Sequence, residues 1–127
     1  MDQKTKIKAF TDLDAWKEGH KLVLLVYKAT EKFPAKETFS LVDQMRRSAV
    51  SITSNIAEGF SRRGLKEKIQ FYSMSMGSLT ELQNQILIAK DVGYLSGLNL
   101  PKLQEQSIIV HKITNGLIKS TKLLQNP

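Results

Sequence analysis

The sequence contains no cysteine and only three prolines among its 127 residues. Without cysteine the chain has no disulfide, no thiol nucleophile and no thiolate ligand for a metal. The most apolar run, Leu22–Val26, is far shorter than the roughly 20 residues that cross a bilayer. The charged start, Met1–Lys8, is not followed by the apolar segment of a signal peptide. Together these absences predict a cytoplasmic protein.

Histidine is also scarce, since only His20 and His111 occur. No HExxH, ExxH, phosphate-binding-loop or GxSxG pattern is present. The missing ExxH excludes the carboxylate and histidine spacing that di-iron bundles need. His20 falls on an apolar stripe, which favours a hydrogen-bonded core histidine over a ligand. The sequence therefore predicts a non-enzymatic protein with no catalytic residue, no metal site and no cofactor.

Acidic residues are outnumbered, because 12 Asp and Glu face 19 Lys and Arg and leave a net charge of +7. This excess suits a polyanion such as nucleic acid, although many small basic proteins bind no anion. Six basic and two acidic residues lie between Gln44 and Lys68, which places +4 of the total charge in 25 residues. From spacing alone, pairing of Arg62 with Glu58 and solvation of the others is an equal alternative. The candidates for phosphate contact are Arg46, Arg47, Arg62, Arg63, Lys66 and Lys68.

Helical periodicity dominates what is present, and no strand-like alternation of useful length occurs. A first helix should end before Pro34, and a second should run from about Thr38 to a stop at Gly59. A third is expected over Leu65 to Val92, closed by Gly93, and a fourth from Asn99. The expected core stripe of the first helix is Leu13, Trp16, His20, Val23, Tyr27 and Thr30. The sequence thus predicts an all-α, antiparallel up-down-up-down four-helix bundle, a single domain over 1–127 with 1–10 as a flexible N-terminal segment.

The second predicted helix is apolar on two sides. At 100° per residue, the core arc holds Leu41, Met45, Ser48, Ala49, Ile52, Ile56 and Gly59. A neighbouring arc holds Val42, Arg46, Val50, Thr53 and Ala57, and small residues there let another backbone approach closely. Gly77 costs its helix about 1 kcal/mol relative to alanine, which close packing should offset. We therefore predict a subunit interface at Val50, Thr53, Ala57 and Gly77.

A buried polar network is predicted between the second and third helices. Glu81 and Gln85 lie one turn apart and are placed to hydrogen-bond with Asn55 or Ser54. Such a network would fix the register of the two helices. Its predicted members are Ser54, Asn55, Glu58, Glu81 and Gln85.

Three stretches resemble a known family: DLDAWKEGHKLVLLVYKATEKFP, QMRRSAVSITSNIAEGFSRR and KEKIQFYSMSMGSLTELQNQILIAKDVGYLS. They are similar to the bacterial 23S rRNA intervening-sequence proteins. The resemblance implies a four-helix bundle that assembles as a homopentamer with a basic surface. Reading frames of this family were noticed in insertions within large-subunit rRNA genes. A relative binds nucleic acid and partners a reverse transcriptase in diversity-generating retroelements, so a protein partner of that kind is a further expectation.

The chain departs from the family pattern at two positions near the second interhelix linker. Lys68 stands where an aromatic residue is frequent, and Gly64 where a serine or threonine cap is usual. Function of the linker is therefore less transferable than the fold.

Two functions are consistent with these observations. The first is nucleic-acid binding, to RNA or DNA, through the basic residues of an oligomeric bundle. The alternative is a protein–protein interaction scaffold or accessory subunit whose arginines serve subunit contacts, because Arg46 adjoins the second apolar arc.

Overall fold

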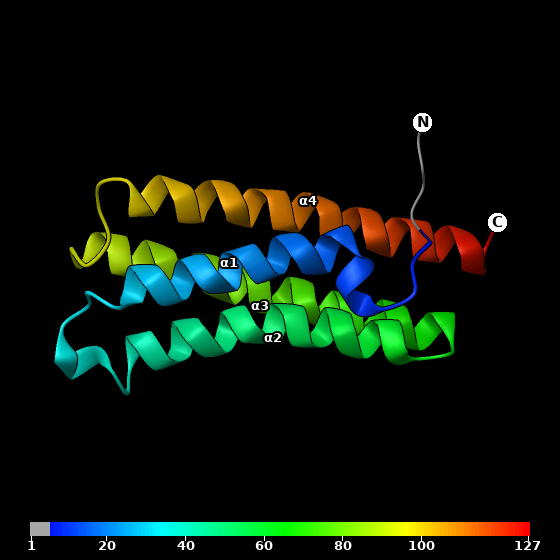
Figure 1. The fold of residues 1–127 in the computed structure, drawn as a ribbon, viewed down its shortest axis with the longest axis horizontal. Coiled ribbons are helices and arrows are strands. Elements are labelled where there is room, and N and C mark those ends of the chain that lie inside the picture. Colours follow the sequence, from blue (N-terminus) through cyan, green and yellow to red (C-terminus); the bar gives the residue numbers. More distant parts are fainter. Residues whose placement is uncertain (1–5) are drawn as a thin grey trace.

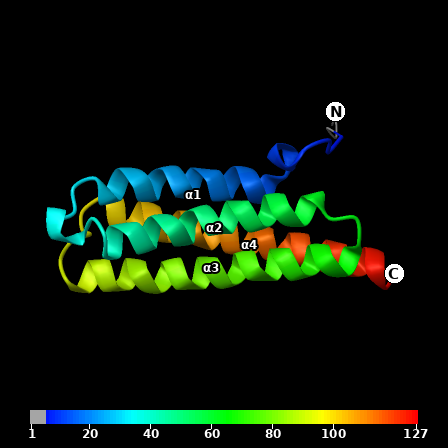
Figure 2. The same ribbon diagram turned by 90° about the horizontal axis from the view of Figure 1, so that it is seen from below.

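Four long helices lie side by side and alternate in direction (Figures 1 and 2). The computed structural model describes residues 6–127. Within them, each helix contacts its two neighbours, whereas the diagonal pairs make no comparable contact. The helices are α1 (Asp14–Thr30), α2 (Leu41–Ser61), α3 (Leu65–Asp91) and α4 (Asn99–Gln125), with short 3-10 helices η1 (Phe10–Asp12) and η2 (Ala35–Glu37). The predicted all-α up-down-up-down bundle is confirmed.

Apolar side chains from all four helices fill the centre of the bundle. Leu22 of α1, Ile52 of α2, Leu82 of α3 and Val110 of α4 are all 0% exposed. Burying each side chain of this size stabilises the fold by about 1.5–3 kcal/mol. The predicted core arc of α2 is confirmed, because its apolar members Met45, Ala49, Ile52 and Ile56 are completely buried. None of the described helices is both long and apolar enough to span a membrane.

The core face of α1 differs from the predicted stripe. The residues that face the core are Ala15, Gly19, Leu22, Val26 and Ala29. His20 is exposed and its ring stacks on Trp16 with 4.7 Å between centroids, so the prediction of a core histidine is wrong. Tyr27 is exposed as well. The error has a physical cause: α1 is apolar on two sides, and periodicity by itself does not say which side meets the bundle.

Two glycines end or continue their helices for different reasons. Gly93 has φ +89° and follows α3, as predicted, because glycine tolerates the left-handed conformation there. Gly59 does not end α2, which continues to Ser61. A Cβ at Gly59 would lie 2.7 Å from Cε1 of Tyr72, so this glycine permits close approach of α2 and α3.

The N-terminal segment is attached to the bundle where it is described. The backbone N–H groups of Lys8 and Ala9 donate to Asp12 Oδ2 at 2.9 and 3.0 Å. These bonds lower the pKa of Asp12. The Phe10 ring meets Trp16 edge-on at 5.5 Å. Flexibility is therefore not expected for Lys8–Phe10, and the rest of that prediction, for residues 1–5, lies outside the described residues.

Candidate nucleic-acid interface

The six predicted phosphate-binding residues do not form one cluster. Arg46 and Arg47 lie in the N-terminal half of α2, whereas the other four flank the turn between α2 and α3. Since a helix rises 1.5 Å per residue, the two groups stand roughly 20–25 Å apart. Three of the six are also engaged by their own chain, as the next contacts show.

Arg46 joins α2 to the C-terminal end of α1. Its Nε donates to Thr30 Oγ1 at 3.0 Å and its Nη2 to the Tyr27 carbonyl at 3.3 Å. The guanidinium also lies 4.5 Å from the centre of the Tyr27 ring. Carbonyl groups at a helix C-terminus lack intrahelical donors and carry partial negative charge, which favours a cation. Arg46 therefore serves the fold, and its availability for phosphate is small.

Arg62 and Lys68 hold the turn between α2 and α3. Arg62 donates from Nη2 to Glu58 Oε2 at 3.0 Å and stacks 4.7 Å from the centre of Phe71. The alternative prediction of this ion pair is confirmed. Lys68 donates from Nζ to the Phe60 carbonyl at 2.7 Å, at the C-terminal end of α2. Burial lowers the pKa of Lys68, because a buried ammonium loses hydration.

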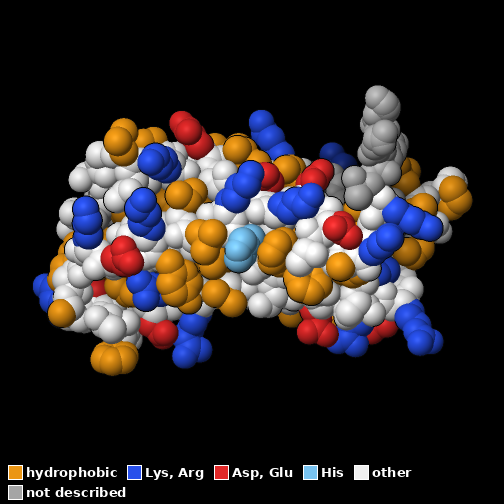
Figure 3. Space-filling view, viewed as in Figure 1, with side chains coloured by type: hydrophobic (Ala, Val, Ile, Leu, Met, Phe, Trp, Pro, Cys, Tyr) orange, Lys and Arg blue, Asp and Glu red, His pale blue; other side chains and the backbone are white. Residues whose placement is uncertain are grey.

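The remaining candidates, Arg47, Arg63 and Lys66, are exposed. The side chain of Arg47 is 79% exposed, although its Nε donates to Asp43 at 3.0 Å. Within residues 6–127, ion pairs occur only at Lys21–Glu18, Arg47–Asp43 and Arg62–Glu58. Figure 3 shows Lys and Arg side chains spread over one face rather than gathered into a patch. Most of the positive charge therefore faces solvent without a carboxylate partner.

The predicted subunit interface divides in the same way. Val50 is 39% exposed and Ala57 is half-buried. Thr53 is buried inside the chain, where its Cγ2 lies 3.0 Å from the position of a Cβ on Gly19. Thr53 packs α2 on α1 and is removed from the interface prediction. Gly77 is exposed, and a Cβ there would meet nothing within 4 Å, so the packing expected at Gly77 does not occur inside the chain.

Sequence reasoning missed that α1 contributes to the same surface. Tyr27 and Val50 line one shallow hollow between α1 and α2. We define the α1–α2 face by residues that are exposed or half-buried on these helices: Trp16, His20, Tyr27, Val50 and Ala57. In the view onto α1, hydrophobic side chains surround a histidine near the middle (Figure 3). The signal was available, because these α1 residues form the stripe that was assigned to the core.

The polar network between α2 and α3 involves other residues than those predicted. Ser51 Oγ and Ser78 Oγ are 2.8 Å apart, and Ser75 Oγ donates to the Ile52 carbonyl at 2.8 Å. Asn55 donates to the carbonyl and the hydroxyl of Ser51. Glu58 pairs with Arg62 instead, and Ser54 is exposed.

The antiparallel register explains why Glu81 and Gln85 do not reach Asn55. Ser51 lies opposite Ser78, so residues further along α3 lie opposite earlier residues of α2. Glu81 and Gln85 consequently share a groove with Arg47 and Ser48. The predicted contacts with Asn55 and Ser54 are wrong, because that pairing needs a shift of about two helical turns.

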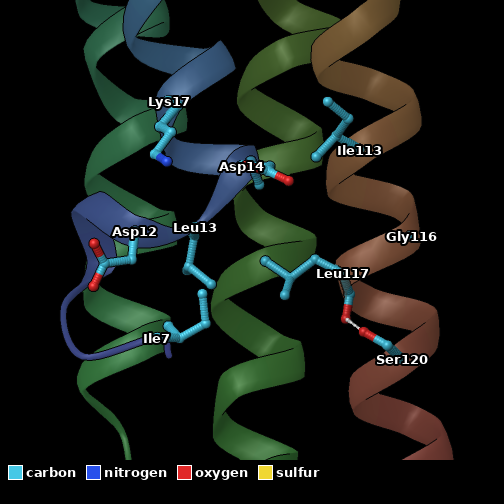
Figure 4. A pocket seen from close by; sticks show the side chains of 10 residues that line it. Ile7, Asp12, Leu13, Asp14, Lys17, Ile113, Gly116, Leu117 and Ser120 are labelled. Atoms are coloured by element: carbon cyan, nitrogen blue, oxygen red, sulfur yellow. Dashed lines mark hydrogen bonds between the residues drawn. The ribbon is translucent and has the colours of Figure 1, made fainter. Parts of the chain in front are cut away.

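A hollow of about 550 Å³ lies between the N-terminal segment and α4. In Figure 4, Ile7, Leu13 and Leu117 point toward one another across it, and Ser120 donates to the Leu117 carbonyl. Asp12 also lines the hollow, but its Oδ2 already accepts two backbone N–H groups. No cluster of three or more potential metal ligands occurs in the described part of the chain. The hollow thus offers an apolar surface without a catalytic arrangement.

Residues 11–116, nearly the whole bundle, match the family described as 23S rRNA-intervening sequence protein. The chain belongs to this family. Its fold is similar to that of a family relative, a protein with unknown function from the S23 ribosomal protein family of Bacteroides thetaiotaomicron. The two chains are 16% identical with a TM-score of 0.74, over 83% of this chain and 95% of that chain. No curated protein matches the sequence. The resemblance stated from the sequence is confirmed, and the likeness to the solved structure shows the shared fold.

Proposed function

We propose that this 23S rRNA-intervening sequence protein is a non-enzymatic, oligomeric helical bundle that binds RNA or DNA through exposed basic residues. The observation that carries the proposal is the unpaired positive charge. The net charge is +7, and only three ion pairs neutralise basic side chains within residues 6–127. Such a surface attracts phosphate with little sequence preference, because backbone contacts provide affinity rather than base recognition.

The turn between α2 and α3 is the best-supported contact region. Arg63 and Lys66 are exposed there, and Gly64 precedes the first turn of α3. The N-terminus of a helix presents backbone N–H groups and partial positive charge, which favours phosphate. Arg62 and Lys68 hold the turn in place through their contacts with Glu58 and the Phe60 carbonyl. Arg47 adds a second, separate contact on α2.

Fluorescence anisotropy with single- and double-stranded oligonucleotides, titrated with salt, tests this proposal. We expect the double variant Arg63→Ala/Lys66→Ala to reduce the salt dependence by about two counterions, since each phosphate contact releases roughly one. The matched control is Lys112→Ala/Lys119→Ala, which removes the same charge from exposed positions of α4. A control with the same effect would contradict a specific contact region. Absence of binding at low salt, or affinity that does not change with salt, would contradict nucleic-acid binding itself.

The second candidate function is a protein scaffold or accessory subunit, which the exposed α1–α2 face favours. In this case Arg47 would serve subunit contacts rather than phosphate. Arg47→Ala would then dissociate the oligomer in light scattering. Under nucleic-acid binding the assembly persists and only the affinity for nucleic acid falls.

A further inference from the structure

A polar groove of about 290 Å³ separates α2 from α3. Its walls are short of hydrogen-bond partners in a way that the fold does not need. The lining residues are Gln44, Arg47, Ser48, Ser51, Glu81 and Gln85.

Gln85 is the buried member of this groove. It is 5% exposed, and its Oε1 is buried without a hydrogen-bond partner among the described residues. A buried acceptor that has lost water and gained no donor costs roughly 1–3 kcal/mol. Its helix neighbours Leu82 and Ile86 fill the core, so packing alone gives no reason for an amide here. The unpaired oxygen indicates that a donor from outside the chain completes the site.

The other groups in the groove define the chemistry of that donor. Glu81 lies one turn before Gln85, is exposed, and forms no ion pair within residues 6–127. Arg47, on the α2 wall, uses its Nε for Asp43 and has its other guanidinium N–H groups without a protein partner in the described residues. The α3 wall therefore offers acceptors and the α2 wall offers donors. Because the charges of Glu81 and Arg47 offset each other, a neutral ligand with both donors and acceptors fits better than an ion.

The geometry points to an unpaired guanine base of a single-stranded nucleic acid as the ligand of this groove. Guanine carries two adjacent donors, N1–H and the N2 amino group, which match a carboxylate such as that of Glu81. Its O6 and N7 acceptors match an arginine such as Arg47. The second N2 hydrogen would supply the donor that Gln85 Oε1 lacks. Adenine, cytosine and uracil each lack two adjacent donors on one edge.

This inference rests on the proposed nucleic-acid binding and adds a base preference to it. The test uses single-stranded 12-mers of thymidine that carry one central guanine, inosine or adenine. Inosine keeps N1–H, O6 and N7 but lacks the N2 amino group. In anisotropy titrations at fixed salt, we expect the guanine oligomer to bind about tenfold more tightly than the inosine oligomer, because a bidentate contact is lost.

Two variants assign this preference to the groove. Glu81→Gln should abolish the difference between guanine and inosine, whereas Glu105→Gln on α4 makes the same charge change at an exposed position and should retain it. Gln85→Met replaces the unpaired amide by an apolar side chain of similar shape. We expect it to keep or raise the thermal midpoint while reducing the preference for guanine.

The outcomes separate failure of this inference from failure of the proposed function. Salt-dependent binding with equal affinities for guanine and inosine overturns the guanine site and leaves nucleic-acid binding intact. Absence of binding to every oligomer overturns both. A change of oligomeric state in Glu81→Gln would show that the groove is a subunit contact. Tighter binding of an arginine-containing peptide than of the guanine oligomer would assign the groove to a protein partner, and either result overturns the inference.

Discussion

Gly59 and Gly77 both lie inside long helices, but their surroundings are opposite. A Cβ at Gly59 would lie 2.7 Å from the Tyr72 ring, whereas one at Gly77 would meet nothing within 4 Å. We expect Gly59→Ala to lower the free energy of unfolding by about 1–3 kcal/mol, because α3 has to move. Gly77→Ala should raise it by about 0.5–1 kcal/mol, because alanine favours the helix. Urea unfolding of both variants measures the difference.

Gly116 provides the control for a role of Gly77 in assembly. It is also exposed in the middle of a helix, α4, with nothing within 4 Å of an added Cβ. Gly116→Ala should stabilise the chain as much as Gly77→Ala does. If Gly77 lies in a subunit contact, only Gly77→Ala weakens the oligomer in light scattering. Equal behaviour of the two variants would remove Gly77 from the predicted interface.

At the scale of helices, the neighbouring arginines of α2 have different roles. Arg46 donates to Thr30 and to the Tyr27 carbonyl on α1, while Arg47 makes an exposed pair with Asp43. We expect Arg46→Ala to cost about 1.5–3 kcal/mol of unfolding free energy and Arg47→Ala about 0–1 kcal/mol. Arg46→Lys should not restore stability, since an ammonium lacks the planar fork. Similar losses for the two alanine variants in urea unfolding would contradict this assignment.

The contact between α1 and α4 should depend on pH. Gln106 donates to the backbone carbonyl of Glu18 at 2.8 Å and to its Oε1 at 2.9 Å. This bond, followed by one from Lys21, holds the pKa of Glu18 below its usual value of 4.5. The unfolded chain therefore takes up the proton first as the pH falls. The stabilisation by ionised Glu18 is complete above about pH 4.5 and is lost as the pH falls through the lowered pKa.

Urea midpoints of the native chain and of Glu18→Gln between pH 7 and pH 3 measure this effect. The difference between the two proteins should be small, because Glu18 is partly exposed, and it should close toward pH 3. Other carboxylates titrate in both proteins and cancel in the comparison. A constant difference over this range would show that the charge of Glu18 does not contribute.

At the scale of the whole molecule, the α1–α2 face predicts assembly. Light scattering on the pure protein should detect an oligomer, which the sequence resemblance expects to be a pentamer. Val50→Glu should shift it toward the monomer without loss of helicity, because burying a carboxylate in a subunit contact is costly. Ile109→Glu on α4 is the control, since Ile109 is 40% exposed and Val50 39%. A stable monomer of the native chain at micromolar concentration would contradict the predicted interface.

The two helices with the clearest sequence signals show how far prediction reached. The core arc of α2 was predicted because Met45, Ala49, Ile52 and Ile56 follow a helical period, and burial confirms it. On α1 the same reasoning selected the side with Trp16 and His20, which is exposed. Both sides of α1 are apolar, so the choice between them depends on how the neighbouring helices are oriented.

The sequence by itself determined the four helices, the all-α bundle and the excess of positive charge, because periodicity and composition are properties of the chain. Only the tertiary structure decided which basic side chains remain available, since Arg46 and Lys68 bind helix-end carbonyls that become neighbours on folding. It also decided that Glu81 and Gln85 share a groove with Arg47 rather than with Asn55. The physical reason is the register of α2 against α3, which depends on contacts such as Ser51–Ser78 between residues distant in sequence.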